Sequence, residues 1–129
     1  MASLLEVDEA GNAMVSALIE RAGQEPVEWL RRYFEAYLGP LVHCLYRYEL
    51  AFMPHGENVI LVLKDGVPVR AVMKDIAEEV VVMGRRLDLP AEVSRIQVDI
   101  PDTEKVLAIF TDVFDCIFRF RGARLVEDG

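Results

Sequence analysis

The chain has 129 residues, of which 53% are hydrophobic and 28% charged, and its formal net charge at pH 7 is -8. This length and hydrophobicity predict one folded domain over residues 1–129 and exclude a disordered tail. The acidic balance disfavours a nucleic-acid partner, and the apolar runs are too short for a membrane-spanning helix. The N-terminus lacks a basic leader region and the two cysteines are widely spaced, so we expect a cytoplasmic protein.

The first third of the sequence predicts two helices. Apolar residues between positions 12 and 22 fall on one helical face, and Gly23 is typical of a helix C-terminus. A second helix is expected to open at Glu25-Pro26, because proline is tolerated in a first helical turn. Its apolar stripe continues to Tyr46, and Gly39-Pro40 predicts a kink or a break within it.

The middle of the sequence predicts a β-hairpin. Residues 58–63 are β-branched and apolar, as in a buried strand, and Lys64-Asp65-Gly66 is a typical hairpin turn. Residues 68–74 alternate as the return strand. Residues 50–53 are interpreted as a short strand that feeds this hairpin. The segment 77–83 fits either a strand or a helix.

A last helix is predicted to start at Pro101-Asp102, with its body over residues 105–120. The order of elements indicates an α+β fold. We expect a small antiparallel sheet built on the central hairpin and packed with three main α-helices.

The residues that suggest chemistry flank this hairpin. His55, Glu57 and Asn58 precede its first strand, and Lys74 and Asp75 follow its second strand. Because a hairpin brings its two ends together, these five residues are expected to share one small volume. Carboxylate and amide oxygens suit Mg²⁺ that carries phosphates, and a lysine and a histidine suit phosphate charge.

A second interpretation of the same residues needs no ligand. The Gly56-Glu57-Asn58 segment is also ordinary turn chemistry before a strand, and Asp75 could cap the segment that follows. The residues alone therefore leave open a choice between an anion or metal site and a solvated end of the hairpin.

Four segments in this order resemble the NRPS-independent siderophore synthetases, the aerobactin-synthetase-like (IucA/IucC) family, and most closely its desferrioxamine-type branch. These segments are Trp29-Leu30-Arg31-Arg32-Tyr33 with Tyr37-Leu38, residues 50–63, residues 74–80 and residues 109–116. The resemblance extends from about Ser3 to Asp128. It is strongly specific for the four segments together and weak for the histidine motif alone. It identifies the chain with part of the family's C-terminal palm domain.

The resemblance implies a role in siderophore biosynthesis, through ATP- and Mg²⁺-dependent adenylation of a carboxylate and amide formation with a hydroxamate-amine. It assigns His55 to the substrate carboxylate or phosphate, and Asn58 and Asp75 to the nucleotide and metal. Glu57 could assist as a metal or nucleotide ligand, and Lys74 could stabilise charge beside His55. The family commonly forms homodimers.

Three positions depart from the family pattern. Glu57 stands where many members have Gln, Lys74 stands where many have Arg, and Met53 occupies a position where other branches have a metal-binding Glu. The family's N-terminal phosphate-binding residues are also missing. We therefore expect a cloned fragment or a truncated gene product that holds part of an active site and does not catalyse ligation alone.

Two other functions are considered from the sequence. A kinase-like phosphotransferase also holds Mg²⁺ and ATP with a His/Asn segment and a later Asp, but the catalytic Asp five residues before Asn58 is replaced by Met53. A non-catalytic module could instead self-associate through an apolar surface left by missing partner domains.

Overall fold

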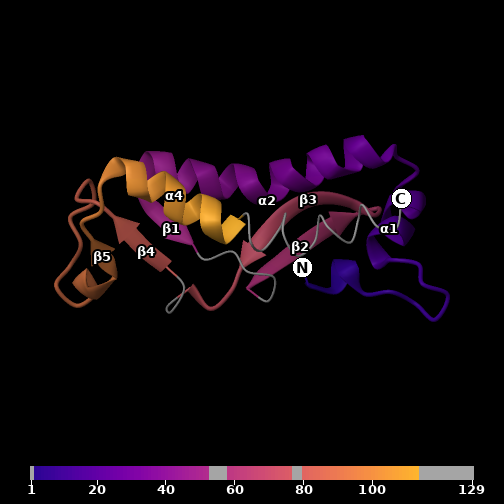
Figure 1. The fold of residues 1–129 in the computed structure, drawn as a ribbon, viewed down its shortest axis with the longest axis horizontal. Helices are drawn as coiled ribbons and strands as arrows, with labels where there is room; N and C mark the ends of the chain where they lie inside the picture. The colour runs from indigo at the N-terminus through magenta and orange to yellow at the C-terminus, as the bar shows by residue number, and fades with distance from the viewer. Residues whose placement is uncertain (1, 53–57, 77–79, 114–129) are drawn as a thin grey trace.

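The computed structural model describes residues 2–52, 58–76 and 80–113, and for residues 2 and 108–113 it describes the backbone alone. The elements in chain order are η1 (Ala2–Leu5), α1 (Met14–Ala22), α2 (Pro26–Tyr48), β1 (Leu50–Phe52), β2 (Val59–Lys64), β3 (Val67–Met73), β4 (Val80–Met83), η2 (Ser94–Ile96), β5 (Gln97–Val98) and α4 (Asp102–Val113). Figure 1 shows α2 running along the molecule, with the hairpin beside one part of it and β1 beside the other. No helix in this described part of the chain is both long and apolar enough to cross a membrane.

The two N-terminal helices form where the sequence predicts them. Gly23 ends α1 with a left-handed φ of 61°, which glycine adopts without a Cβ penalty. Pro26 stands in the first turn of α2. Of the kink or break predicted at Gly39-Pro40, the break is wrong, because α2 continues through Pro40 to Tyr48, and the kink stays a prediction. Tyr37 and Leu41 are buried on either side of the proline, and their packing holds the helix together across the lost hydrogen bond.

The predicted hairpin is confirmed as β2 and β3. Asp65 and Gly66 form the two-residue turn with positive φ values of 53° and 82°, which is the pattern of a type I′ turn. The antiparallel register pairs Val59 with Met73, and an irregularity follows Val62. The hairpin is a separate two-stranded sheet.

A second, three-stranded sheet has the order β1-β4-β5. β1 pairs with β4 in an antiparallel register that runs from Leu50↔Val82 to Phe52↔Val80. β4 pairs with β5 in parallel. The strand expected near residues 50–53 is thus confirmed, and the ambiguous segment 77–83 contains strand β4, while residues 77–79 lie outside the described part.

The larger core lies between α1, α2 and the hairpin. Its buried members are Val15, Trp29, Tyr33, Tyr37, Leu41 and Val59. Trp29 stacks on Tyr33 with a ring-centroid distance of 5.9 Å, and its Nε1–H donates to the Gly66 carbonyl at 2.8 Å. This bond fixes the hairpin turn to the first turns of α2.

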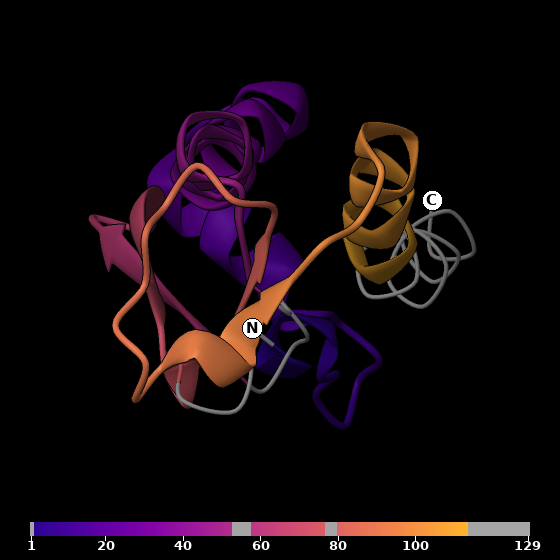
Figure 2. The ribbon, with the colours of Figure 1, turned by 90° about the vertical axis from the view of Figure 1, so that its left-hand side faces the viewer.

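The smaller core joins the end of α2 to the second sheet. Its buried members are Leu45, Ala51 and Met83, with Val81 and Ile100 packed against them. Figure 2 shows α4 to one side of α2 and the strands. The α+β prediction is confirmed, with three α-helices in the described part of the chain. The hairpin does not form the base of a single sheet, because β1 pairs with β4 in a second sheet, and the parallel β4–β5 pair is an addition that the sequence did not predict.

Candidate functional site

The candidate residues lie on the two connections that join one sheet to the other. Residues 53–58 connect β1 to β2, and residues 74–79 connect β3 to β4. His55 and Glu57 are on the first connection but lie outside the described residues. Asn58, Lys74 and Asp75 are described. The described candidates therefore lie at the hairpin side of the two crossings between the hairpin and the three-stranded sheet.

The open end of the hairpin brings Asn58 and Lys74 together, as the sequence predicted. The Lys74 backbone N–H donates to the Asn58 carbonyl at 2.9 Å, one step beyond the Val59↔Met73 pair. Asn58 is 5% exposed, which is unusual for a polar residue at the end of a strand. The structure therefore fixes the position of its backbone relative to Lys74 and Asp75.

Lys74 and Asp75 form an ion pair at this end of the hairpin. The Lys74 Nζ lies 2.7 Å from Asp75 Oδ2, and both side chains are about half exposed. Asp75 has a left-handed φ of 56°, a conformation that aspartate tolerates better than most residues. Ile76, which follows, is helical, and the next three residues lie outside the described part, so capping by Asp75 stays a prediction.

The side-chain groups of the described candidate residues are of the chemical types that bind a Mg²⁺–phosphate group. Asp75 supplies a half-exposed carboxylate and Lys74 a half-exposed ammonium group for phosphate charge, whereas the amide of Asn58 belongs to a buried residue. In the described part of the chain, no cluster of three His, Cys, Asp or Glu side chains could hold a metal by itself. A metal here would thus depend on phosphate oxygens or on further ligands.

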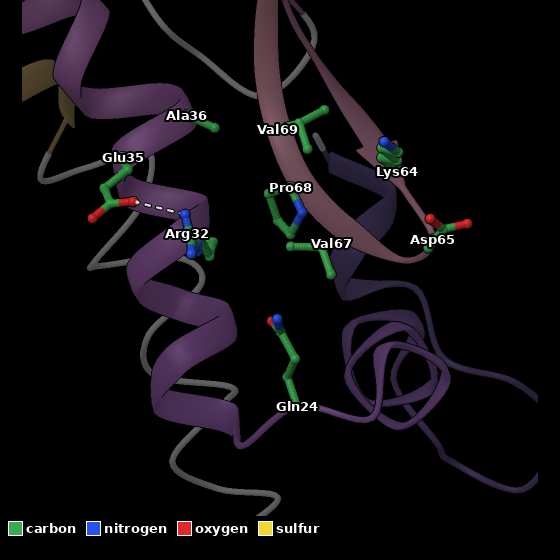
Figure 3. Close-up of a pocket in the computed structure, with 9 residues that line it drawn as sticks. All are labelled: Gln24, Arg32, Glu35, Ala36, Lys64, Asp65, Val67, Pro68 and Val69. Carbon is green, nitrogen blue, oxygen red and sulfur yellow. Dashed lines mark ion pairs between the residues drawn. The ribbon is translucent and has the colours of Figure 1, made fainter.

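A hollow of about 490 Å³ lies at the opposite, turn end of the hairpin (Figure 3). It is lined by Gln24, Arg32, Glu35, Ala36, Lys64, Asp65, Val67, Pro68 and Val69. Figure 3 shows the Gln24 side chain directed towards the gap between α2 and β3. Arg32 pairs with Glu35 at 3.8 Å, and the lining holds two basic and two acidic side chains. The hollow consequently shows no preference for an anion or a cation.

An ionic cluster that the sequence did not predict surrounds Glu49. Its carboxylate accepts hydrogen bonds from Lys105 Nζ at 2.8 Å and from the Arg86 backbone N–H at 3.0 Å, although Glu49 is only 7% exposed. The hydrogen bond from Lys105, followed by that from Arg86, lowers the pKa of Glu49 below 4.5. Hydrogen bonds to Asp102 and Glu49 raise the pKa of Lys105 above 10.5. The one sequence feature that could have indicated this cluster is an acidic residue within the apolar run from Tyr48 to Met53, because a buried acid needs polar partners.

The sequence of this chain is similar to one family model and to proteins of siderophore biosynthesis. A family model described as ferric iron reductase FhuF-like transporter matches residues 27–129. Putrebactin synthase of Shewanella sp. (strain MR-4) is 49% identical over 120 residues, covering 93% of this chain and 19% of that protein. The rhizobactin siderophore biosynthesis protein RhbF of Rhizobium meliloti (strain 1021) is 33% identical over 129 residues, covering 97% of this chain and 22% of that protein.

A solved structure has the same fold over the whole chain. Aerobactin synthetase IucC from a hypervirulent pathotype of Klebsiella pneumoniae superposes with a TM-score of 0.87 at 30% identity. The match covers all of this chain and 24% of that chain. The present chain therefore spans about a fifth of the length of the curated relatives that it matches.

Proposed function

The chain belongs to the FhuF-like family and matches the C-terminal region of the NRPS-independent siderophore synthetases, and we propose that it contributes part of their nucleotide site. The reaction proposed for the whole enzyme joins a small carboxylate to a hydroxamate-amine. The carboxylate is activated with ATP as an acyl-adenylate, pyrophosphate leaves, and the amine then displaces AMP. The chain is proposed to act in the cytoplasm, within an enzyme that forms homodimers.

Each candidate residue has a distinct proposed role. Asn58 and Asp75, with Glu57, hold Mg²⁺ and the phosphates. His55 and Lys74 stabilise negative charge on a phosphate or acyl oxygen. The metal ion supplies neutralisation of the phosphate charge. The single observation that supports these roles is the hydrogen bond from Lys74 N–H to the Asn58 carbonyl, with Asp75 as the next residue.

Substitution of Asp75 by Asn tests the proposal by removing the carboxylate charge with little change in size. Asp65→Asn is a matched control, because Asp65 is also exposed, has a similar φ of 53°, and lies at the other end of the same hairpin. Mg²⁺-ATP is titrated into each protein while amide NMR spectra are recorded. We expect saturable shifts at Asn58, Lys74 and Asp75 in the wild type and in Asp65→Asn, and at least a tenfold weaker affinity in Asp75→Asn.

Two results would contradict this function for the chain. One is the absence of any saturable shift in the wild type at millimolar Mg²⁺-ATP. The other is equal affinity of Asp75→Asn and Asp65→Asn, which would mean that the carboxylate at position 75 has no part in binding. No ligation product is expected from the chain alone.

Self-association is a second candidate function, and one surface of α2 favours it. A hollow of about 720 Å³ along this helix is lined mainly by apolar side chains, and Val27 within it is 80% exposed. Analytical ultracentrifugation tests this candidate with Val27→Glu as the variant. A wild-type protein that sediments as a monomer at all concentrations would exclude it.

A further inference from the structure

Glu49 occupies a junction between α2 and the three-stranded sheet. It follows the last residue of α2 with a left-handed φ of 55°, and its N–H donates to the Leu45 carbonyl at 2.8 Å. Its own carbonyl accepts the Met83 N–H at 2.7 Å. The backbone of this one residue therefore ties the end of the long helix to the end of β4.

The side chain of Glu49 adds two further segments to the junction. Lys105 of α4 and the Arg86 backbone of the loop after β4 both donate to its carboxylate, and Arg86 Nε lies 3.5 Å from Oε1. The Lys105 side chain is 12% exposed and also contacts Asp102 at 2.7 Å. These groups line a cavity of about 190 Å³ between α2 and α4. The cluster is internally paired, because two acids meet two bases.

Because Gly84 has no side chain, the Glu49 carboxylate can lie directly against the backbone at this position. A Cβ built on Gly84 would overlap with the carboxylate carbon and both of its oxygens, and the φ of 141° at this position disfavours any side chain. The backbone after β4 is thus shaped around the acid. Such a fit indicates a fixed geometry more than it indicates stability, because buried ion pairs contribute little net stability compared with apolar packing.

The junction lies at one end of the β1–β4 ladder, and the candidate site lies at the other end. The ladder begins at Leu50↔Val82 beside Glu49 and ends at Phe52↔Val80. From there the chain enters the connections 53–58 and 74–79. The first and last of the three ladder pairs are roughly 7 Å apart, so a change of register at the junction would also displace Phe52 and Val80, which border the connections.

We propose that Glu49 is a positioning residue that clamps α4 and the loop after β4 onto the β1–β4 ladder. The clamp holds Phe52 and Val80, which border the two connections, in their ladder pairing. Its consequence for nucleotide binding rests on the proposed function, whereas the clamp itself does not.

Hydrogen exchange of the full chain, without nucleotide, tests the clamp. In Glu49→Gln we expect amide exchange in β1, β4 and α4 to accelerate at least tenfold, while exchange in β2 and β3 stays within twofold of the wild type. Glu28→Gln is the matched control, since it removes an ion-paired acid from the surface of α2, the helix that Glu49 follows. Equal acceleration across the whole chain, or no acceleration in the second sheet, would overturn the proposal.

Gly84→Ala is a second substitution that is expected to break the contacts of the Glu49 carboxylate. It should produce the same regional acceleration, because the added methyl group displaces the carboxylate. The double variant Glu49→Ala/Gly84→Ala should accelerate exchange in β1, β4 and α4 by less than the product of the two single effects, because the backbone strain at position 84 remains but the overlap with the carboxylate is gone. Fully multiplicative effects of the two substitutions would mean that they act independently, which contradicts a shared clamp.

The affinity for Mg²⁺-ATP then separates positioning from stability. We expect Glu49→Gln to weaken binding at least fivefold and Glu28→Gln to leave it unchanged. Unchanged affinity in a protein whose β1–β4 exchange has accelerated would overturn the positioning role. If the wild type binds no nucleotide, the proposed function fails, and the exchange experiment still decides whether the clamp exists.

Discussion

The two ends of the long helix α2 are attached to their sheets by different means. Its N-terminal part packs on the hairpin through a continuous aromatic and aliphatic core that includes Trp29, Tyr33 and Tyr37. Its C-terminal end meets the β1–β4–β5 sheet through a smaller core and the ion cluster of Glu49. Apolar burial supplies most of the free energy of folding, whereas charged groups define a geometry. The hairpin therefore serves as the stable half, and the second sheet as the half whose position depends on specific pairing.

The largest expected effect comes from breaking the apolar half. Trp29→Ala removes a side chain that is 1% exposed, together with its stack on Tyr33 and its bond to Gly66. Large-to-small substitutions of this kind cost about 3–5 kcal/mol of unfolding free energy. Urea denaturation followed by circular dichroism measures the change. Val27→Ala, on the exposed face of the same helix, should alter stability by less than about 0.5 kcal/mol.

A smaller effect is expected at the turn that Trp29 holds. Gly66→Ala forces a side chain into a φ of 82° and places its Cβ 3.2 Å from the Leu18 carbonyl oxygen. Gly23→Ala has a φ of 61° but no atom within 4 Å. A left-handed residue with a side chain costs about 1–2 kcal/mol, so Gly23→Ala should lose that amount and Gly66→Ala more. Equal losses in thermal unfolding would show that the contact with α1 has no energetic weight.

The stable half is also the half that the sequence predicted well. Both N-terminal helices and the hairpin depend on signals within a few residues, such as Gly23 after an apolar face and Asp65-Gly66 between two strands. Of the kink or break expected at Gly39-Pro40, the break does not occur, because burial of the neighbouring side chains outweighs the local preference of proline.

The second half could not be predicted in the same way. β5 has two residues and pairs in parallel, so it carries no periodic signal. Glu49 finds its partners 37 residues away at Arg86 and 56 residues away at Lys105, a distance that no local pattern reports. At the candidate site, the meeting of Asn58 with Lys74 followed from the hairpin alone. The placements and roles of His55 and Glu57 stay predictions.

The smallest effect, and the sharpest distinction between the halves, is expected from pH. Pairing with Lys105 holds the pKa of Glu49 below 4.5, so its contribution to stability is complete above about pH 4.5 and is lost as pH falls through the lowered value. The pKa of Lys105 is raised above 10.5, so its contribution is present below about pH 10.5 and is lost at higher pH. In the hairpin half, hydrogen bonds from Arg31 and Asn12 lower the pKa values of Glu28 and Asp8, but both carboxylates are exposed to solvent screening.

Hydrogen exchange measured at pH 3.5 and at pH 6, with each rate corrected for its intrinsic pH dependence, tests this difference. Lowering the pH should accelerate exchange in β1, β4 and α4 more than in β2 and β3. Glu49→Gln should reduce that difference, because glutamine does not titrate, whereas Asp102, whose pKa is also lowered by its hydrogen bond with Lys105, still does. A difference of unchanged size in the variant would assign the acid sensitivity to other groups.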